Sequence, residues 1–373
     1  MRWDIFCNVV DHFGDIGVSW RLARQLAAEH GLDVCLWVDD LGTFHRLCPE
    51  LDPGVEQQTV GGVIVRRWRR DDSDRQLQDG IGDVVVEAFG SQLATPWLIA
   101  MAARASKPVW INLEYLSAED WVEGCHRMAS PHPRLPLVKH FFFPGFTAGT
   151  GGLLRERDLA SQREQAAREC EPRAGNVTTV SLFGYGGPAV GALLSAWVQA
   201  EEPVLVLVPE SVLLDDVATF FGVKGARAGD RFERGALSAL ILPFQPQRQY
   251  DRLLWSCDCN FVRGEDSFVR AQWAERPFVW NIYPQDAGAH WAKLHAFHER
   301  YGAGLSAEAG LAVREFWRQW NLREPPAAAM ATAWRRFWSH RAELEMWASA
   351  WAAQLTANGD LASNLVRFAS GRL

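Results

Sequence analysis

The feature of this sequence that most limits its fold is an alternation of short apolar segments with amphipathic ones. Near the start, apolar runs at residues 4–10 and 34–38 are separated by a stretch of helical periodicity at residues 17–29. Short runs rich in β-branched and aromatic residues predict strands, whereas apolar residues spaced three or four apart predict a helix. Strands that alternate with helices predict a parallel, doubly wound sheet.

The same alternation continues through the first half and restarts in the second. Further strands are expected at residues 63–68, 83–89, 108–113, 177–182, 204–208, 237–242, 260–262 and 278–282. Helices are expected in the second half at residues 211–221 (with Ser211 as the N-cap), 247–256 and 267–275. From about residue 286 onward the chain is expected to be helical.

Two sets of alternation predict two Rossmann-like domains, because 373 residues exceed what one core usually supports. We expect domains at residues 1–150 and 176–355, a polar connector at residues 151–175, and a final helix at residues 356–373 that packs back on the first domain. Two such domains facing across a cleft are typical of GT-B glycosyltransferases and related epimerases, of periplasmic-type binding proteins and of two-domain dehydrogenases. We expect no signal peptide, which argues against the second class. No G-x-G-x-x-G follows the first strand, which argues against the third.

Charge and cysteine content limit the possible partners. The net charge of −7 argues against nucleic-acid binding by bulk electrostatics, and we expect the one basic cluster, at residues 66–70, to be a solvated strand end. The 7 cysteines are scattered, as expected of reduced, buried thiols in the cytoplasm. No apolar run approaches the roughly 18 residues that span a bilayer, so no membrane partner is expected.

The loop after the first expected strand contains two carboxylates, Asp11 and Asp15, together with Gly14. This loop lies at the carboxyl edge of a parallel sheet, where open α/β sheets bind ligands. Asp11 and Asp15 are therefore candidate catalytic residues. A helix N-cap is the simpler interpretation of Asp15.

A second candidate segment runs from Arg263 to Ser267, between a strand and a helix of the second half. A helix N-terminus in that place is a natural phosphate site. Glu265 and Asp266 would repel a diphosphate, so we expect them to turn away from it, contact sugar hydroxyls or face a cationic acceptor. A capping segment without a ligand is the alternative.

Two further turns, at residues 183–187 and 244–247, follow expected strands of the second half. The first is rich in glycine and could approach a nucleotide. The second offers Phe244 and Gln247 to a nucleobase, although each turn could also be a plain strand–helix connection. No Asp-x-Asp pair stands in a suitable loop, so no metal is expected, and Arg263 with the helix dipole would take its place.

Longer stretches carry a specific resemblance. The runs FCNVVDHFGDIGVSWRLARQLA, LEYLSAEDWVEG, FFFPGFTAGTGGLLRE and LPFQPQRQYDRLLWSCDCNFVRGEDSFVRAQWAERPFVWNIYPQ resemble the bacterial protein-arginine rhamnosyltransferases that modify elongation factor P. The resemblance extends over the full chain. It implies a GT-B fold, dTDP-β-L-rhamnose as donor with no cofactor, an arginine of folded elongation factor P as acceptor, and inversion at the anomeric carbon. It also implies that the first domain receives the protein and the second holds the sugar nucleotide.

The resemblance also implies roles for individual residues. It places the essential carboxylates on Asp11, Asp15 and Glu265, and the nucleotide contacts on Tyr185, Phe244, Gln247, Asp266 and Ser267. Arginine is always protonated in proteins, so we expect Asp15 to be the base that takes its proton. We expect Asp11 to hold the loop or the guanidinium, and Glu265 to position the acceptor or the sugar. Two alternatives stay open: a non-catalytic module that binds nucleotide sugars, and a GT-B epimerase.

Overall fold

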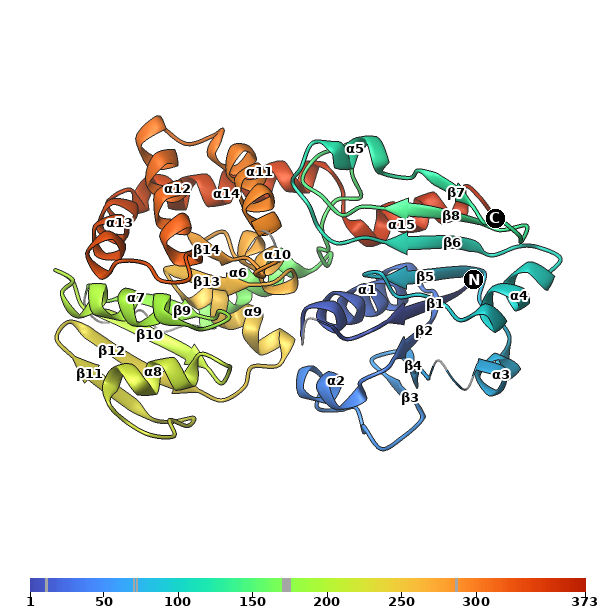
Figure 1. Ribbon diagram of the computed structural model, residues 1–373, viewed down its shortest axis with the longest axis horizontal. Helices are drawn as coiled ribbons and strands as arrows, with labels where there is room; N and C mark the ends of the chain where they lie inside the picture. The colour runs from blue at the N-terminus through green and yellow to red at the C-terminus, as the bar shows by residue number, and fades with distance from the viewer. Residues whose placement is uncertain (11–12, 70, 72, 170–175, 286–287) are drawn as a thin grey trace. The chain divides into compact units, whose positions relative to one another are not determined.

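The computed structural model describes residues 1–10, 13–69, 71, 73–169, 176–285 and 288–373. The chain divides into two compact units (Figure 1): unit 1 comprises Met1–Arg157 and Leu355–Leu373, and unit 2 comprises Asp158–Gln354. Each unit contains one largely parallel sheet with helices packed against it.

Unit 1 is built on an eight-stranded sheet in the order β3-β4-β2-β1-β5-β6-β8-β7. Its strands are β1 (Arg2–Cys7), β2 (Asp33–Val38), β3 (Gln57–Val60), β4 (Val63–Arg67), β5 (Val84–Ala88), β6 (Val109–Leu113), β7 (Ala129–Pro131) and β8 (Val138–Phe142). Strand β1 pairs in parallel with both β2 and β5. Because the strand order reverses at β1, its carboxyl end is the topological switch point at which such sheets bind ligands.

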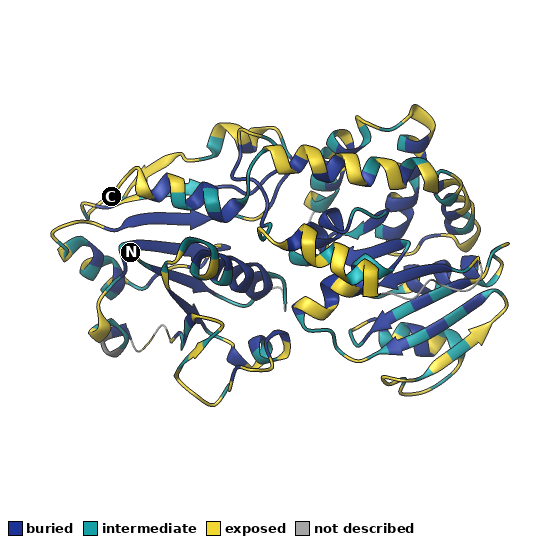
Figure 2. Ribbon diagram, turned by 180° about the vertical axis from the view of Figure 1, so that it is seen from behind, coloured by how far each residue is buried: buried dark blue, intermediate teal, exposed yellow. Residues whose placement is uncertain are grey.

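Helices cover the sheet of unit 1 so that its central strands are buried, as the dark strands of Figure 2 show. The helices are α1 (Gly14–His30), α2 (Leu41–Leu47), α3 (Ser73–Gln76), the 3₁₀ turn η1 (Leu77–Asp79), α4 (Thr95–Ala103), α5 (Trp121–Cys125) and α15 (Leu361–Ser370). Helix α15 ends the chain yet belongs to unit 1. Gln25 Nε2 of α1 donates to Asp360 Oδ1 at 3.1 Å, and Asn364 Nδ2 donates to the Gly151 carbonyl at 3.0 Å.

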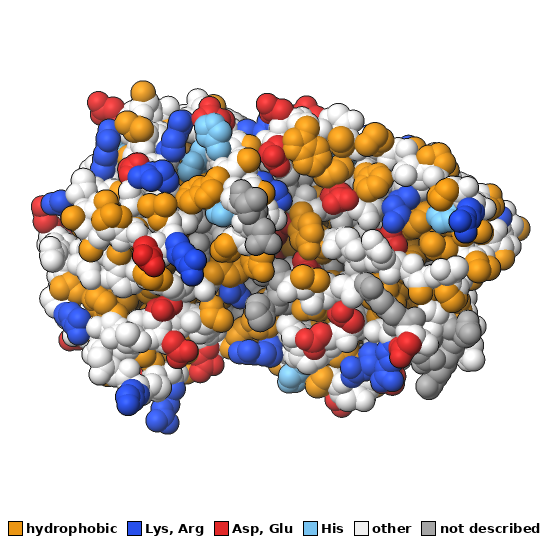
Figure 3. Space-filling view, in the orientation of Figure 1, with side chains coloured by type: hydrophobic (Ala, Val, Ile, Leu, Met, Phe, Trp, Pro, Cys, Tyr) orange, Lys and Arg blue, Asp and Glu red, His pale blue; other side chains and the backbone are white. Residues whose placement is uncertain are grey.

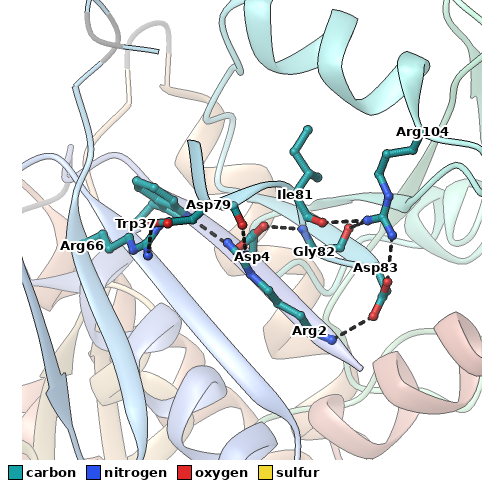
Figure 4. A network of polar contacts seen from close by, with 9 residues as sticks. All are labelled: Arg2, Asp4, Trp37, Arg66, Asp79, Ile81, Gly82, Asp83 and Arg104. Carbon is teal, nitrogen blue, oxygen red and sulfur yellow. Dashed lines mark hydrogen bonds and ion pairs between the residues drawn. The ribbon is translucent and has the colours of Figure 1, made fainter. Parts of the chain in front are cut away.

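The amino end of β1 contains a polar cluster (Figure 4). The buried Asp4 carboxylate accepts hydrogen bonds from the Gly82 N–H at 2.6 Å and from Arg2 Nη2 at 3.0 Å. Burial raises the pKa of the Asp4 carboxyl, although the charge of Arg2 opposes this. Asp83 joins the cluster by accepting from the Arg2 N–H at 3.0 Å and from Arg104 Nη2 at 3.0 Å. Since the cluster lies at the end of β1 opposite to the switch point, we assign it a structural role.

Unit 2 is built on a six-stranded sheet in the order β11-β12-β10-β9-β13-β14. Its strands are β9 (Thr178–Leu182), β10 (Val204–Pro209), β11 (Arg231–Arg234), β12 (Leu237–Leu242), β13 (Cys259–Arg263) and β14 (Phe278–Asn281). Strand β9 pairs in parallel with β10 and β13. It therefore occupies in unit 2 the position that β1 has in unit 1, and its carboxyl end is the second switch point.

The remaining helices form the cover of unit 2. They are α6 (Leu159–Glu169), α7 (Pro188–Val198), α8 (Leu214–Phe221), α9 (Gln247–Ser256), α10 (Asp266–Trp273), α11 (Ala289–Gly302), α12 (Ala307–Asn321), α13 (Ala327–Ser339) and α14 (Arg341–Ala357). Aromatic contacts join the sheet to the late helices: the ring of Trp197 in α7 lies 5.5 Å from Trp334 of α13 and 5.6 Å from Phe261 of β13.

The expected elements agree with the observed ones to within three residues at each end. Three expected helix starts are wrong. Helix α1 begins at Gly14 rather than residue 17, and α10 begins at Asp266 rather than Ser267. Helix α8 begins at Leu214, because the Ser211 hydroxyl accepts from the Leu213 N–H at 3.4 Å and forms a turn before the helix.

Two expectations about side chains have different outcomes. The six described cysteines are free, and all but Cys125 are buried. The basic cluster is not simply solvated: Arg66 pairs with Asp79 at 2.5 Å, while Arg67 and Arg69 both pair with Glu56. Within the part of the chain that the structure describes, no helix has both the length and the apolar character needed to cross a membrane.

Candidate functional site

The residues that leave β1 are held by side chains from both neighbouring strands. Asp39, directly after β2, accepts from the Val9 N–H through Oδ1 at 2.9 Å and from Asn8 Nδ2 through Oδ2 at 2.9 Å. Ser91, shortly after β5, accepts from the Asn8 N–H through its hydroxyl at 3.0 Å. Residues 8 and 9 are therefore fixed to both neighbouring strands at the switch point of unit 1.

Asp15 lies in the first turn of α1 and is 2% exposed. Its Oδ2 accepts from the Val10 N–H at 2.9 Å. The N-cap is Phe13, so the interpretation of Asp15 as an N-cap is wrong. A carboxylate in the first turn of a helix interacts favourably with the helix dipole. Asp11, the other expected aspartate, lies outside the described residues.

Cys7 precedes this segment but is not a nucleophile. Burial raises the pKa of the Cys7 thiol far above its ordinary value, and the charges of Asp15 and Asp39 raise it further, while a hydrogen bond with Ser19 opposes them. The thiol therefore stays neutral near pH 7. The influence of both carboxylates on one thiol also places Asp15 and Asp39 in the same electrostatic surroundings.

In unit 2 the turns after β9 and β13 come together around Arg263. This residue ends β13 and is 7% exposed. Its guanidinium carbon lies 4.6 Å from the centre of the Phe183 ring and 4.8 Å from that of Tyr185. The two turns meet because β9 and β13 are neighbours in the sheet. A permanently charged, planar donor held against two aromatic rings at a switch point is suited to bind phosphate.

The turn from β13 into α10 is shaped by Ser267. The Ser267 hydroxyl accepts from the Arg263 N–H at 3.0 Å and donates to the Arg263 carbonyl. Gly264 has a φ of +59°, which favours glycine, and Trp280 Nε1 donates to its carbonyl at 2.8 Å. Glu265 is the N-cap of α10 and makes no side-chain capping bond. The hydroxyl of Ser267 thus has an internal partner, and its contact with a nucleotide stays a prediction.

Two helix N-termini compete as the phosphate site in unit 2. At α7, the Gly187 N–H donates to Asp216 Oδ2 at 2.7 Å, so a carboxylate already occupies this end. At α10, Asp266 accepts from Gln247 Nε2 at 3.3 Å, and the Arg263 N–H donates to the Ser267 hydroxyl in the same turn. Both ends therefore carry carboxylates, since Glu265 and Asp266 begin α10. The positive charge of Arg263 is what favours the N-terminus of α10 for a diphosphate.

Phe244 and Gln247 lie between β12 and α9. Phe244 is half-buried and its N–H donates to Glu210 Oε2 at 3.3 Å, whereas Gln247 is 4% exposed. Strand β12 is three positions from β13, which ends in Arg263, and this corresponds to roughly 14 Å at about 4.8 Å per strand. A nucleotide whose base lies near Phe244 and whose phosphates lie near Arg263 would extend across the ends of the strands between them.

Sequence reasoning missed several residues around these turns. Asn281, at the end of β14, accepts from the Tyr185 N–H at 2.8 Å. Tyr283 is 51% exposed, and its ring lies 5.3 Å from that of Tyr185. Their position at the carboxyl end of an expected strand (Asn281) or directly after it (Tyr283) was the available signal. Asp39, directly after an expected strand of unit 1, offered the same signal and was also missed.

Two observations bear on how a ligand is selected. Among the residues that the structure describes, no group of three or more His, Cys, Asp or Glu side chains is placed to hold a metal ion. Acidic and basic side chains are interspersed on the face shown in Figure 3. On this face, selection of an anionic ligand would depend on local groups rather than on a broad field of one sign.

Comparisons with known proteins agree over almost the whole chain. Residues 3–370 match the family model of the elongation factor P (EF-P) rhamnosyltransferase EarP. Protein-arginine rhamnosyltransferases of Pseudomonas putida and Pseudomonas aeruginosa are 48% and 45% identical to this chain, each over 98% of both proteins. A solved structure described as the structural basis for EarP-mediated arginine glycosylation of translation elongation factor EF-P is 34% identical. It covers 100% of this chain and 99% of its own, with a TM-score of 0.68.

A more distant structure supports the fold class alone. The calicheamicin glycosyltransferase CalG4 is 13% identical, covers 100% of this chain and 99% of its own, and has a TM-score of 0.53. The expected GT-B architecture with a helical C-terminal segment is confirmed.

Proposed function

Because this chain belongs to the EF-P rhamnosyltransferase family EarP, we propose that it transfers rhamnose from dTDP-β-L-rhamnose to an arginine side chain of EF-P with inversion at the anomeric carbon. Since the acceptor is a translation factor, the reaction would take place in the cytoplasm. No nucleic acid and no membrane takes part.

The single observation that carries the donor site is the contact of the Arg263 guanidinium with the rings of both Phe183 and Tyr185. Arg263 and the N-terminus of α10 together would bind the diphosphate and stabilise it as it leaves, without a metal ion. Phe244 would stack on thymine, with Gln247 beside it. Tyr185 would contact the diphosphate or the sugar, and Asp266 and Ser267 would complete the site.

Asp15 is the proposed base. In the transfer, a guanidinium nitrogen forms a bond to the anomeric carbon while the bond from that carbon to the β-phosphate oxygen breaks, and dTDP leaves. The nitrogen is a poor nucleophile because its lone pair is delocalised and its group is protonated. A carboxylate can orient it and accept the proton as the new bond forms. The Val10 N–H, which donates to Asp15 Oδ2, would hold the carboxylate in one orientation.

The other two carboxylates, those of Glu265 and Asp11, would position the substrates rather than accept the proton. Glu265, the N-cap of α10, would place the sugar or the acceptor. Asp11 would hold the loop or the guanidinium.

The test is to incubate the chain with dTDP-rhamnose and EF-P and to measure the intact mass of EF-P. We expect one deoxyhexose on a single arginine, with dTDP released in equal amount. Binding without a mass change would favour a nucleotide-sugar binding module. Conversion of free dTDP-rhamnose to another sugar nucleotide without EF-P would favour an epimerase.

A further inference from the structure

We infer that Asp39 is a positioning residue for rhamnosyl transfer: its carboxylate fixes residues 8–10 so that the Asp15 carboxylate keeps its orientation. The inference deepens the proposed function and rests on the assignment of Asp15 as the base. Nothing in the chemistry of the transfer requires a third aspartate at this place, and the pattern of contacts gives it a distinct task.

The first argument is how Asp39 uses its two oxygens. Oδ1 accepts from the Val9 N–H and Oδ2 from Asn8 Nδ2, both at 2.9 Å. Both partners lie on the segment that leaves β1, although Asp39 itself follows β2. A carboxylate that accepts from two donors on one short segment fixes both its distance and its rotation.

The second argument is the order of the amide groups. The Val9 N–H donates to Asp39, and the next N–H along the chain, that of Val10, donates to Asp15 Oδ2 at 2.9 Å. The Val9 N–H belongs to the Asn8–Val9 peptide unit and the Val10 N–H to the next unit, and the two units meet at the Val9 α-carbon. The hydrogen bond to Asp39 fixes the first unit, and the backbone angles of Val9 then set where the Val10 N–H meets the Asp15 carboxylate.

The third argument is the contrast with the adjacent residue. Asp40 caps α2 by accepting from the Thr43 N–H at 3.0 Å and from the Thr43 hydroxyl at 2.5 Å. These bonds lower the pKa of the Asp40 carboxyl. Two neighbouring aspartates thus serve different purposes. The Asp40 carboxylate caps the helix that follows, whereas the Asp39 carboxylate accepts from the segment that leads to the proposed base. Asp40 is a matched control of the same residue type.

The experiment compares three variants: Asp39→Asn, the exchange Asn8→Asp/Asp39→Asn, and the control Asp40→Asn. In Asp39→Asn an amide would face the amide of Asn8, so one hydrogen bond becomes a contact between two donors. In the exchange, the new amide at position 39 can donate to the new carboxylate at position 8, and its oxygen can still accept from Val9. The exchange leaves the net charge equal to that of the wild type.

We expect kcat for rhamnosyl transfer to fall about 10- to 100-fold in Asp39→Asn, since a displacement of about 1 Å at a reacting group costs up to that much. The KM for dTDP-rhamnose should stay within about twofold, because the donor is assigned to other residues. The exchange should recover most of kcat. Asp40→Asn should leave kcat per folded molecule unchanged and shift the melting temperature little, because asparagine caps a helix about as well as aspartate does.

Amide hydrogen exchange of residues 8–10 gives a readout that does not depend on activity. It should be faster in Asp39→Asn and return toward the wild-type rate in the exchange variant. Unchanged kcat and unchanged amide exchange in Asp39→Asn would overturn the inference. Loss of kcat without recovery in the exchange variant would also overturn it, because Asp39 would then act through its charge or through substrate. If the wild-type chain transferred no rhamnose, the proposed function alone would fail. Amide hydrogen exchange would still show whether Asp39 fixes residues 8–10.

Discussion

Replacement of Arg263 is predicted to weaken dTDP binding by an amount that depends on whether the charge or the planar shape is lost. Arg263→Met removes both the charge-assisted hydrogen bonds to phosphate, worth about 1.5–3 kcal/mol, and the two cation–π contacts with Phe183 and Tyr185. The cation–π contacts already form in the free protein, so they do not add fully to the binding free energy. We therefore expect a loss of about 2–3 kcal/mol in the free energy of dTDP binding, which is roughly a 30- to 150-fold increase in Kd. Arg263→Lys keeps the charge but loses the planar fork, so we expect the Kd for dTDP to rise roughly 5- to 10-fold.

Titration calorimetry with dTDP is the assay, and the melting temperature shows whether each variant is folded. Arg231→Met is the matched control, because Arg231 is 60% exposed on β11 of the same unit. Its affinity for dTDP should equal that of the wild type. If Arg263→Met is folded and binds dTDP as tightly as the wild type does, the stacked guanidinium is not a phosphate ligand and the assignment of the donor site is refuted.

Three further predictions concern unit 2. Phe244→Ala should weaken dTDP binding by about 1–3 kcal/mol, the usual worth of base stacking, and calorimetry would show an unchanged Kd if Phe244 lies outside the site. Arg270→Met should lower the free energy of unfolding in urea by about 3–5 kcal/mol, because Arg270 and Asp251 form a buried pair with two hydrogen bonds of 2.9 Å; a loss under 1 kcal/mol would contradict this. Burial lowers the pKa of His298 to about 3, whereas histidine in the unfolded chain has its ordinary pKa near 6.5. Below pH 6.5 the unfolded chain therefore binds more protons, and the free energy of unfolding should fall as pH drops from about 6.5 toward 3. In urea titrations, His298→Gln should flatten this dependence of the unfolding free energy on pH.

The order of strands and helices could be predicted because burial of parallel strands leaves a direct trace in the sequence. The strand at residues 237–242 and the helix at residues 247–256 agree with β12 and α9 to the residue. The antiparallel edge strands β3, β7 and β11 were missed, and so was the parallel strand β8. These strands are short, and most of their residues are exposed or only partly buried, so they lack the apolar runs by which buried strands are recognised.

The positions of the candidate residues at the ends of strands were also predictable, but their partners were not. The turns at residues 183–187 and 263–267 come together only because β9 pairs with β13, and that pairing is non-local. The roles of Asp39 and Asn281 depend on hydrogen bonds to segments far away in sequence. Periodicity and capping rules describe neighbours along the chain, so they could not assign these contacts.

The central claim is that Asp15 is the base in rhamnosyl transfer, and single-turnover transfer by Asp15→Asn tests it most directly. The variant should be present in excess over EF-P and mixed with dTDP-rhamnose. The appearance of rhamnosyl-EF-P should then be followed by intact mass. The account predicts a rate about 10²- to 10⁴-fold below the wild type, as for loss of a general base, with the Kd for dTDP unchanged by calorimetry. A transfer rate within about threefold of the wild type, which is under 1 kcal/mol in barrier height, would contradict it.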